Sequence, residues 1–127
     1  MSEDVMELVE LAAVARGLKG RALERLEVRG HYVYSAYDGV ERTRYDWLGD
    51  DGDSARIRSA LLIDVNWHAD GDVVCLSDIE NVGIIHSEAL THHNGDRNAA
   101  LRLATLKVAA EIGRAIKGSP RAKMVNF

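Results

Sequence analysis

The feature that most constrains this chain of 127 residues is a long amphipathic segment near its C-terminus. Residues 96–117 are rich in Ala and Leu, follow an Asn-Gly turn signal and precede a Gly-Ser-Pro stop, which predicts one helix. One arc of this helix gathers its buried side chains, which are Leu101, Thr105, Val108, Ala109, Ile112, Ala115 and Ile116. Such a face must pack against another layer, so this helix anchors the fold.

A second helix is predicted at the N-terminus, from about Glu3 to Arg16. Ser2 can cap it, and the acids that follow suit the positive end of the helix dipole. Its apolar stripe consists of Val5, Leu8, Val9, Leu11, Ala12 and Ala15. Residues 21–30 stay ambiguous, because the segment ALERL could also prolong the helix after a break at the glycines.

From residue 31 the composition turns to aromatic and β-branched residues. The runs 31–37 and 40–47 flank an Asp-Gly pair, which predicts a β-hairpin. A second turn signal at 69–72 joins a strand ending near residue 68 to the strand 73–76, and residues 81–90 can add another. We therefore expect an α+β domain, with an antiparallel sheet of about four or five strands packed against the N- and C-terminal helices.

An acidic turn, Asp50-Asp51-Gly52-Asp53, follows the first hairpin. The residues after it alternate as in a strand, but Ile57 and Leu61 also have helical spacing. Because capping acids favour a helix behind them, we predict a short helix from Ser54 to about Leu61, capped by Asp53. The acids lack the glutamate that completes a calcium-binding loop, so capping explains them better than a cation site.

The composition limits the classes of protein to which this chain can belong. The formal net charge of −4 offers no general attraction for nucleic acid, and the single cysteine cannot form an internal disulfide. No apolar run approaches the ~20 residues of a membrane-spanning helix, and the acidic N-terminus does not resemble a signal peptide. We expect one globular domain over residues 1–117 and a C-terminal tail over 118–127.

Three separated segments carry a family resemblance. They are ELVELAAVARGLKG near the start, YDWLGDDGDSAR at 45–56, and DRNAA at 96–100 with LKVAAEIGRAIKG. In this order they resemble a group of small, uncharacterised tailed-phage or prophage proteins. The chain departs from that group at Leu48-Gly49, where Asn-Pro is usual, and in lacking the second arginine that the group carries after an Ala-Thr pair in the last helix. The resemblance implies a phage origin and a location in the host cytoplasm, but no activity.

The strongest candidate ligand site is the start of the last helix, where free backbone amides and the helix dipole favour anions. Asn94 and Gly95 precede this helix, Arg97 and Arg102 add positive charge, and His92 lies just before them. A phosphate, a carboxylate or a phosphorylated nucleoside would suit these groups. The alternative is that Asp96 itself caps the helix.

Other polar residues favour structural interpretations. His86, His92, His93 and Glu88 lack the spacing of a helical metal site, so we predict neither a metal nor another cofactor. Cys75 lies in an apolar strand pattern, where a free thiol packs as a small hydrophobe. Arginines and tyrosine at 42–45, with Arg56 and Arg58, could contact single-stranded nucleic acid, but the acidic net charge argues against it.

Leu103 and Leu106 fall outside the predicted buried arc of the last helix. They indicate an interface, either with a second copy of the chain or with its own tail. We therefore expect a non-enzymatic phage accessory protein that binds a host protein or a small phosphorylated defence signal. The alternatives are a small metal-dependent nucleotide-processing enzyme, using His92, His93 or Glu88, and a nucleic-acid-binding accessory protein.

Overall fold

The computed structural model describes residues 4–19, 26–35, 44–69, 71–78 and 83–118. Its helices are α1 (Val5–Lys19), α2 (Asp51–Ala60) and α3 (Arg97–Gly118), with a short 3-10 helix η2 (Leu90–His93). Its strands are β1 (Leu26–Arg29), β2 (Tyr32–Ser35), β3 (Arg44–Tyr45), β4 (Asp64–Trp67), β5 (Val73–Ser77) and β6 (Ile84–Glu88). The predicted tail lies outside the described residues, and α3 continues to Gly118.

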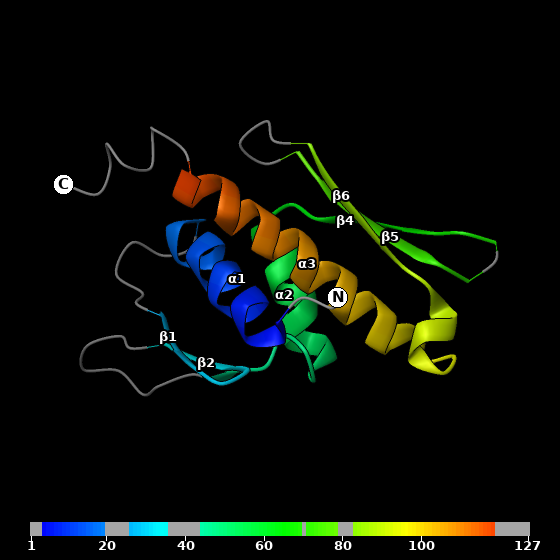
Figure 1. Cartoon of the computed structure of the whole chain (residues 1–127), viewed down its shortest axis with the longest axis horizontal. Coiled ribbons are helices and arrows are strands. Elements are labelled where there is room, and N and C mark those ends of the chain that lie inside the picture. The colour runs from blue at the N-terminus through cyan, green and yellow to red at the C-terminus, as the bar shows by residue number, and fades with distance from the viewer. Residues whose placement is uncertain (1–3, 20–25, 36–43, 70, 79–82, 119–127) are drawn as a thin grey trace.

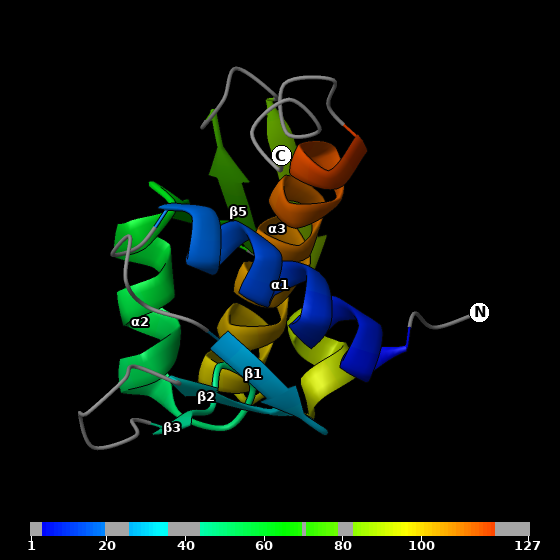
Figure 2. The ribbon, with the colours of Figure 1, turned by 90° about the vertical axis from the view of Figure 1, so that its left-hand side faces the viewer.

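The strands form two antiparallel sheets instead of the single sheet that we predicted. The first sheet has the order β1-β2-β3 and the second has the order β4-β5-β6. The α1–α3 pair lies between them, with α1 contacting the first sheet and α3 contacting the second (Figures 1 and 2). The α+β class is confirmed, but the sequence pattern could not show that the helices separate the strands into two sheets.

The crossing of α1 and α3 depends on small residues. A Cβ built on Gly113 would lie 1.8 Å from the backbone oxygen of Leu11, so glycine alone fits there. Ala12 of α1 and Ala109 of α3 are completely buried. The two helices therefore approach closely enough for backbone to touch backbone, and the alanine-rich pattern of α3 serves this contact.

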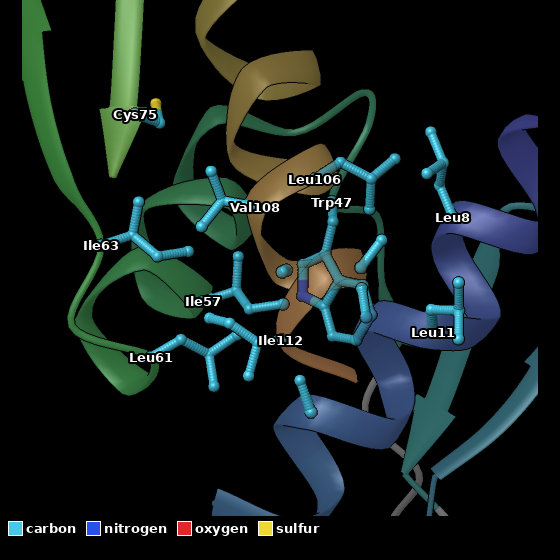
Figure 3. Close-up of a cluster of buried hydrophobic side chains, with 14 of the residues drawn as sticks. Leu8, Leu11, Trp47, Ile57, Leu61, Ile63, Cys75, Leu106, Val108 and Ile112 are labelled. Atoms are coloured by element: carbon cyan, nitrogen blue, oxygen red, sulfur yellow. The ribbon is translucent and has the colours of Figure 1, made fainter. Parts of the chain in front are cut away.

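Trp47 occupies the middle of the hydrophobic core, where all three α-helices meet (Figure 3). Large side chains from α1, α2 and α3 surround it, among them Leu8, Leu11, Ile57, Leu61, Leu106 and Ile112. The complete burial of Leu106 corrects our prediction of an interface, and Leu103 is partly buried against the same core. The predicted arc is buried at Thr105, Val108, Ala109 and Ile112, but it was too narrow, because α3 is covered on several sides, by α1, α2, β5 and β6.

The helix starts differ from the predicted ones by a few residues. The carboxylate of Asp4 accepts from the backbone N–H of Met6 at the start of α1, and the predicted cap, Ser2, lies outside the described residues. The helical prediction after the acidic turn is confirmed, but α2 starts at Asp51 and its N-cap is Asp50, which accepts from the N–H of Asp53 at 2.9 Å. The Asp53 carboxylate instead accepts from the N–H of Asp46 at 2.8 Å and closes the turn before the helix.

Both predicted hairpins are present. Val33 of β2 pairs with Tyr45 of β3, and the Asp-Gly turn between these strands lies outside the described residues. The ambiguous segment 21–30 contributes β1, which joins β2 through a two-residue turn that begins at Gly30, with a φ of 67°. In the second sheet β4 and β5 form the predicted hairpin, and β6 adds to the other edge of β5.

Within the described ranges, no helix is both long and apolar enough to cross a membrane.

Candidate functional site

Three polar side chains meet where the second sheet packs against α3. Glu88 of β6 is buried, and its two carboxylate oxygens have different partners. Oε1 lies 2.8 Å from Nε2 of His93 in η2, and Oε2 accepts from Nζ of Lys107 in α3 at 2.6 Å. This cluster ties η2, β6 and α3 together.

The electrostatics of Glu88 depend on these partners. Burial alone would raise the pKa of this carboxyl, because a charged group loses hydration. Hydrogen bonds and positive charge from Lys107 and His93 outweigh the burial, so the pKa of Glu88 lies below its ordinary value. The carboxylate is therefore ionised at neutral pH, with both oxygens engaged inside the protein.

Two of the three residues in this cluster were candidates in the sequence. Glu88 and His93 were considered for metal-dependent chemistry, whereas Lys107 was not among the candidate residues. Among the described residues, no group of three or more His, Cys, Asp or Glu side chains is placed to hold a metal ion. A separation of 19 residues between Glu88 and Lys107 leaves no sequence signal for their pairing.

The predicted anion site at the start of α3 is occupied by the protein's own groups. Asp96 lies directly before the helix, and its carboxylate accepts from the N–H of Ala99 at 3.0 Å. Asn94 adopts a left-handed conformation and ends η2, and the N–H of Gly95 donates to the oxygen of Leu90. The capping alternative therefore describes this segment.

The charged residues of that prediction do not converge. Arg97 and His92 are exposed. Arg102 points instead to the start of α2, where its Nε donates to the oxygen of Leu48 at 2.6 Å and its Nη1 donates to Asp51 at 2.5 Å. Arg102 thus links α3 to the acidic turn.

A second polar cluster surrounds the single cysteine. The Arg58 guanidinium donates to Ser54 Oγ at 2.7 Å and to Thr105 Oγ1 at 3.1 Å. Cys75 Sγ lies 3.8 Å from the same threonine oxygen and is completely buried. Burial raises the pKa of the Cys75 thiol despite the nearby Arg58, so this thiol is neither accessible nor a ready thiolate.

The two faces of the second sheet differ in composition. The inner face packs on α3 and carries Val73, Cys75, Ser77, Ile84 and Glu88, all buried. By register the outer face carries Val74, Leu76 and Ile85 with Asp64, Asn66 and Ser87. Ile85 is 63% exposed, so this aliphatic face is open to solvent in the described part of the chain.

The outer face of the first sheet has a different character. Val33 is buried on its inner face, and register places Tyr32 and Tyr34 of β2 on the outer face with Glu27, Arg29 and Arg44. The Arg44 guanidinium lies 4.8 Å from the ring centroid of Tyr32, and that of Arg29 lies 5.9 Å from the centroid of Tyr34. The alternation of tyrosine and valine at 32–34 was the sequence signal for this surface.

Comparison of the chain with models of known families, with curated proteins and with solved structures returns no significant match. The resemblance to tailed-phage proteins therefore depends on the three sequence segments alone.

Proposed function

We propose that this chain is a phage accessory protein that acts in the cytoplasm of the infected host by binding a host protein. The observation that carries the binding role is the distribution of exposed apolar side chains. Large exposed hydrophobic residues are Met6, Leu62, Trp67 and Ile85. Ile85 lies on the outer face of the second sheet and Leu62 lies just before β4, whereas the register places Trp67 on the other face, opposite Val73. Exposed apolar surface of this kind is typical of protein interaction sites.

The chemistry of the described polar groups supports binding over catalysis. Cys75 is buried with a raised pKa, and the carboxylate of Glu88 is engaged by two partners. The described residues give the alternative of a metal-dependent enzyme no ligand set. The apolar outer face, by contrast, is available without any rearrangement of the core.

The size of the outer face defines what can cover it. Three strands of five residues or fewer span about 14 Å by about 16 Å, or roughly 230 Å². A stable homodimer typically buries about 800 Å² on each partner, which this face cannot supply. A single helix, about 10 Å wide, matches its dimensions.

The charge of the face selects the chemistry of that helix. Asp64 and Asp78 are exposed, and both follow the alternation of the outward-facing residues. Strands β4, β5 and β6 contain neither lysine nor arginine. The complementary occupant is therefore an amphipathic helix of the host protein, with an apolar stripe flanked by basic residues.

Synthetic helical peptides test this occupant on the full chain by fluorescence anisotropy. One peptide carries the apolar stripe with Lys flanks, one has the same stripe with Glu flanks, and one has the stripe scrambled. The basic peptide should bind at least about tenfold more tightly than the others. Ile85→Ser should weaken binding about tenfold, whereas Met6→Ser, at an exposed hydrophobe of α1, should not.

A photo-crosslinking residue at position 85 tests the host partner in infected cells, with position 6 as the matched control. A single host adduct from position 85, mapped to a basic amphipathic helix, supports the proposal. Equal adducts from both positions, or none from position 85, would show that the outer face around Ile85 does not form a docking surface.

A further inference from the structure

The outer face of the first sheet combines the two side-chain types that hold single-stranded nucleic acid. Tyr32 and Tyr34 stand on the same side of β2, about 7 Å apart along the strand. Arg29 and Arg44 come from the neighbouring strands and flank the two rings. Aromatic faces stack bases and arginines contact phosphates, with little dependence on sequence.

We propose that this face binds a short segment of single-stranded nucleic acid, two or three nucleotides long. In other proteins, aromatic side chains on the exposed face of an antiparallel sheet stack two or three bases. The His31 ring packs against that of Tyr32, 4.4 Å away between centroids and tilted by 43°, and adds a further aromatic group beside the two tyrosines. The site lies on a different sheet from the proposed protein-binding face and does not depend on it.

The arginines are arranged to take part in stacking as well as in charge contacts. The Arg44 guanidinium lies over the ring of Tyr32 and covers one of its faces, so a base on that side would stack on the guanidinium plane and a base on the other side would stack on the ring. Arg29 has the same relation to Tyr34 at a longer distance. Their positive charge stays on the face, since Arg29 is 62% exposed in its side chain.

One acid on this face opposes the binding of phosphate. Glu27 pairs with Arg29, with 3.2 Å between Oε1 and Nη2, and its side chain is 43% exposed. The formal net charge of −4 adds no long-range attraction, so affinity depends on these local contacts. Removing the Glu27 carboxylate should therefore strengthen binding, which a purely structural role of the face would not produce.

Fluorescence anisotropy of labelled oligo-dT and oligo-U with the full chain at low salt is the direct experiment. Tyr32→Leu and Tyr34→Leu should each weaken binding between about fivefold and about 100-fold, while Phe at the same positions should keep it. Arg44→Ala should lower the slope of log affinity against log salt by about 0.7. Glu27→Gln should tighten binding.

The controls separate this site from other effects. Ile85→Ser, on the second sheet, should leave oligonucleotide binding unchanged, and thermal melts should show that the leucine variants are folded. A duplex of the same length should bind more weakly, because its bases cannot stack on the tyrosines. Tighter binding of oligo-U than of oligo-dT would identify RNA as the ligand, and the reverse would identify DNA.

Three results would overturn the proposal. They are no binding of either oligonucleotide at low salt, unchanged affinity in the folded leucine variants, or equal binding of duplex and single strand. Because the peptide and photo-crosslinking experiments use the other sheet, these results would leave the proposed protein-binding function unaffected.

Discussion

The two sheets of this protein are similar in size and topology but present opposite surfaces. Each has three antiparallel strands with one face on the helical pair. The outer face of the first sheet is aromatic and cationic, with tyrosine rings beside arginines, and that of the second sheet is aliphatic with acids near it. One small helical framework can thus offer two chemically distinct faces to two kinds of partner.

The largest expected effect tests the framework that both sheets share. Gly113→Ala should destabilise the protein by about 3 kcal/mol or more, because its Cβ would overlap the backbone of Leu11. Urea unfolding would measure the loss, and binding of peptide and oligonucleotide should fall together. Gly118→Ala has no neighbour within 4 Å and is the matched control. Similar stability of both variants would mean that the helices need not touch at Gly113.

Glu88→Gln should affect the second sheet alone. Removing the buried carboxylate leaves Lys107 and His93 without their partner, at a cost of about 2–4 kcal/mol. Glu27→Gln removes an exposed pair from the first sheet and should cost less than about 1 kcal/mol. Hydrogen exchange should show lost protection in β5 and β6 but not in β1 and β2. Equal losses of protection in both sheets would mean that Glu88 does not stabilise the second sheet selectively.

The same carboxylate predicts a dependence on pH. Because the pKa of Glu88 is lowered in the folded protein, its stabilisation is complete above the ordinary value of 4.5 and disappears as pH falls through the lower folded value. The stability difference between parent and Glu88→Gln should therefore stay constant from neutral pH down to 4.5 and shrink as the pH falls further. Urea melts across this range would measure it. A constant difference would mean that the charge of Glu88 contributes nothing.

Asp50→Ala should cost about 0.5–2 kcal/mol, since this carboxylate caps α2. The effect should spread to both sheets, because the capped turn connects β3 to α2 and precedes β4 in the chain. Asp50→Asn retains a capping oxygen and should recover most of the loss in thermal melts. Equal melting temperatures of the alanine and asparagine variants would mean that the cap does not stabilise the connection between β3 and α2.

The smallest effect is expected at Leu62, which has a left-handed φ of 54° and is 68% exposed. Leu62→Gly should stabilise the protein by roughly 0.5 kcal/mol, because relief of backbone strain slightly exceeds the added entropy of the unfolded chain. Binding of the basic peptide should nevertheless weaken, while oligonucleotide binding stays unchanged. A variant that is less stable would indicate that Leu62 supports the fold instead of the docking face.

Local sequence patterns predicted most of the elements because their causes are local. Periodicity and turn residues located α1, α3, both hairpins and the helix after the acidic turn. The cap of α2 was assigned to a neighbour of the correct residue, since Asp50 and Asp53 satisfy the same pattern. Only the backbone geometry distinguishes such neighbours.

The candidate sites were less predictable, because they depend on contacts between distant segments. Arg102 seemed placed for an anion at the start of α3, but its partners, Leu48 and Asp51, come from another part of the chain. Lys107 was not a candidate residue, yet it donates to Glu88 in the second sheet. The partners of the side chains around a central helix depend on which elements cover that helix. The periodicity of the sequence does not predict those elements.

By itself, the sequence determined the α+β class and the positions of most helices and strands. It also determined the acidic net charge and the presence of a single cysteine. The tertiary structure decided that the strands form two sheets and that α3 is buried on several sides, including at Leu106. It also decided which sheet faces stay open. The physical reason is that helices and turns depend on neighbours in sequence, whereas layer order and exposed faces depend on long-range packing.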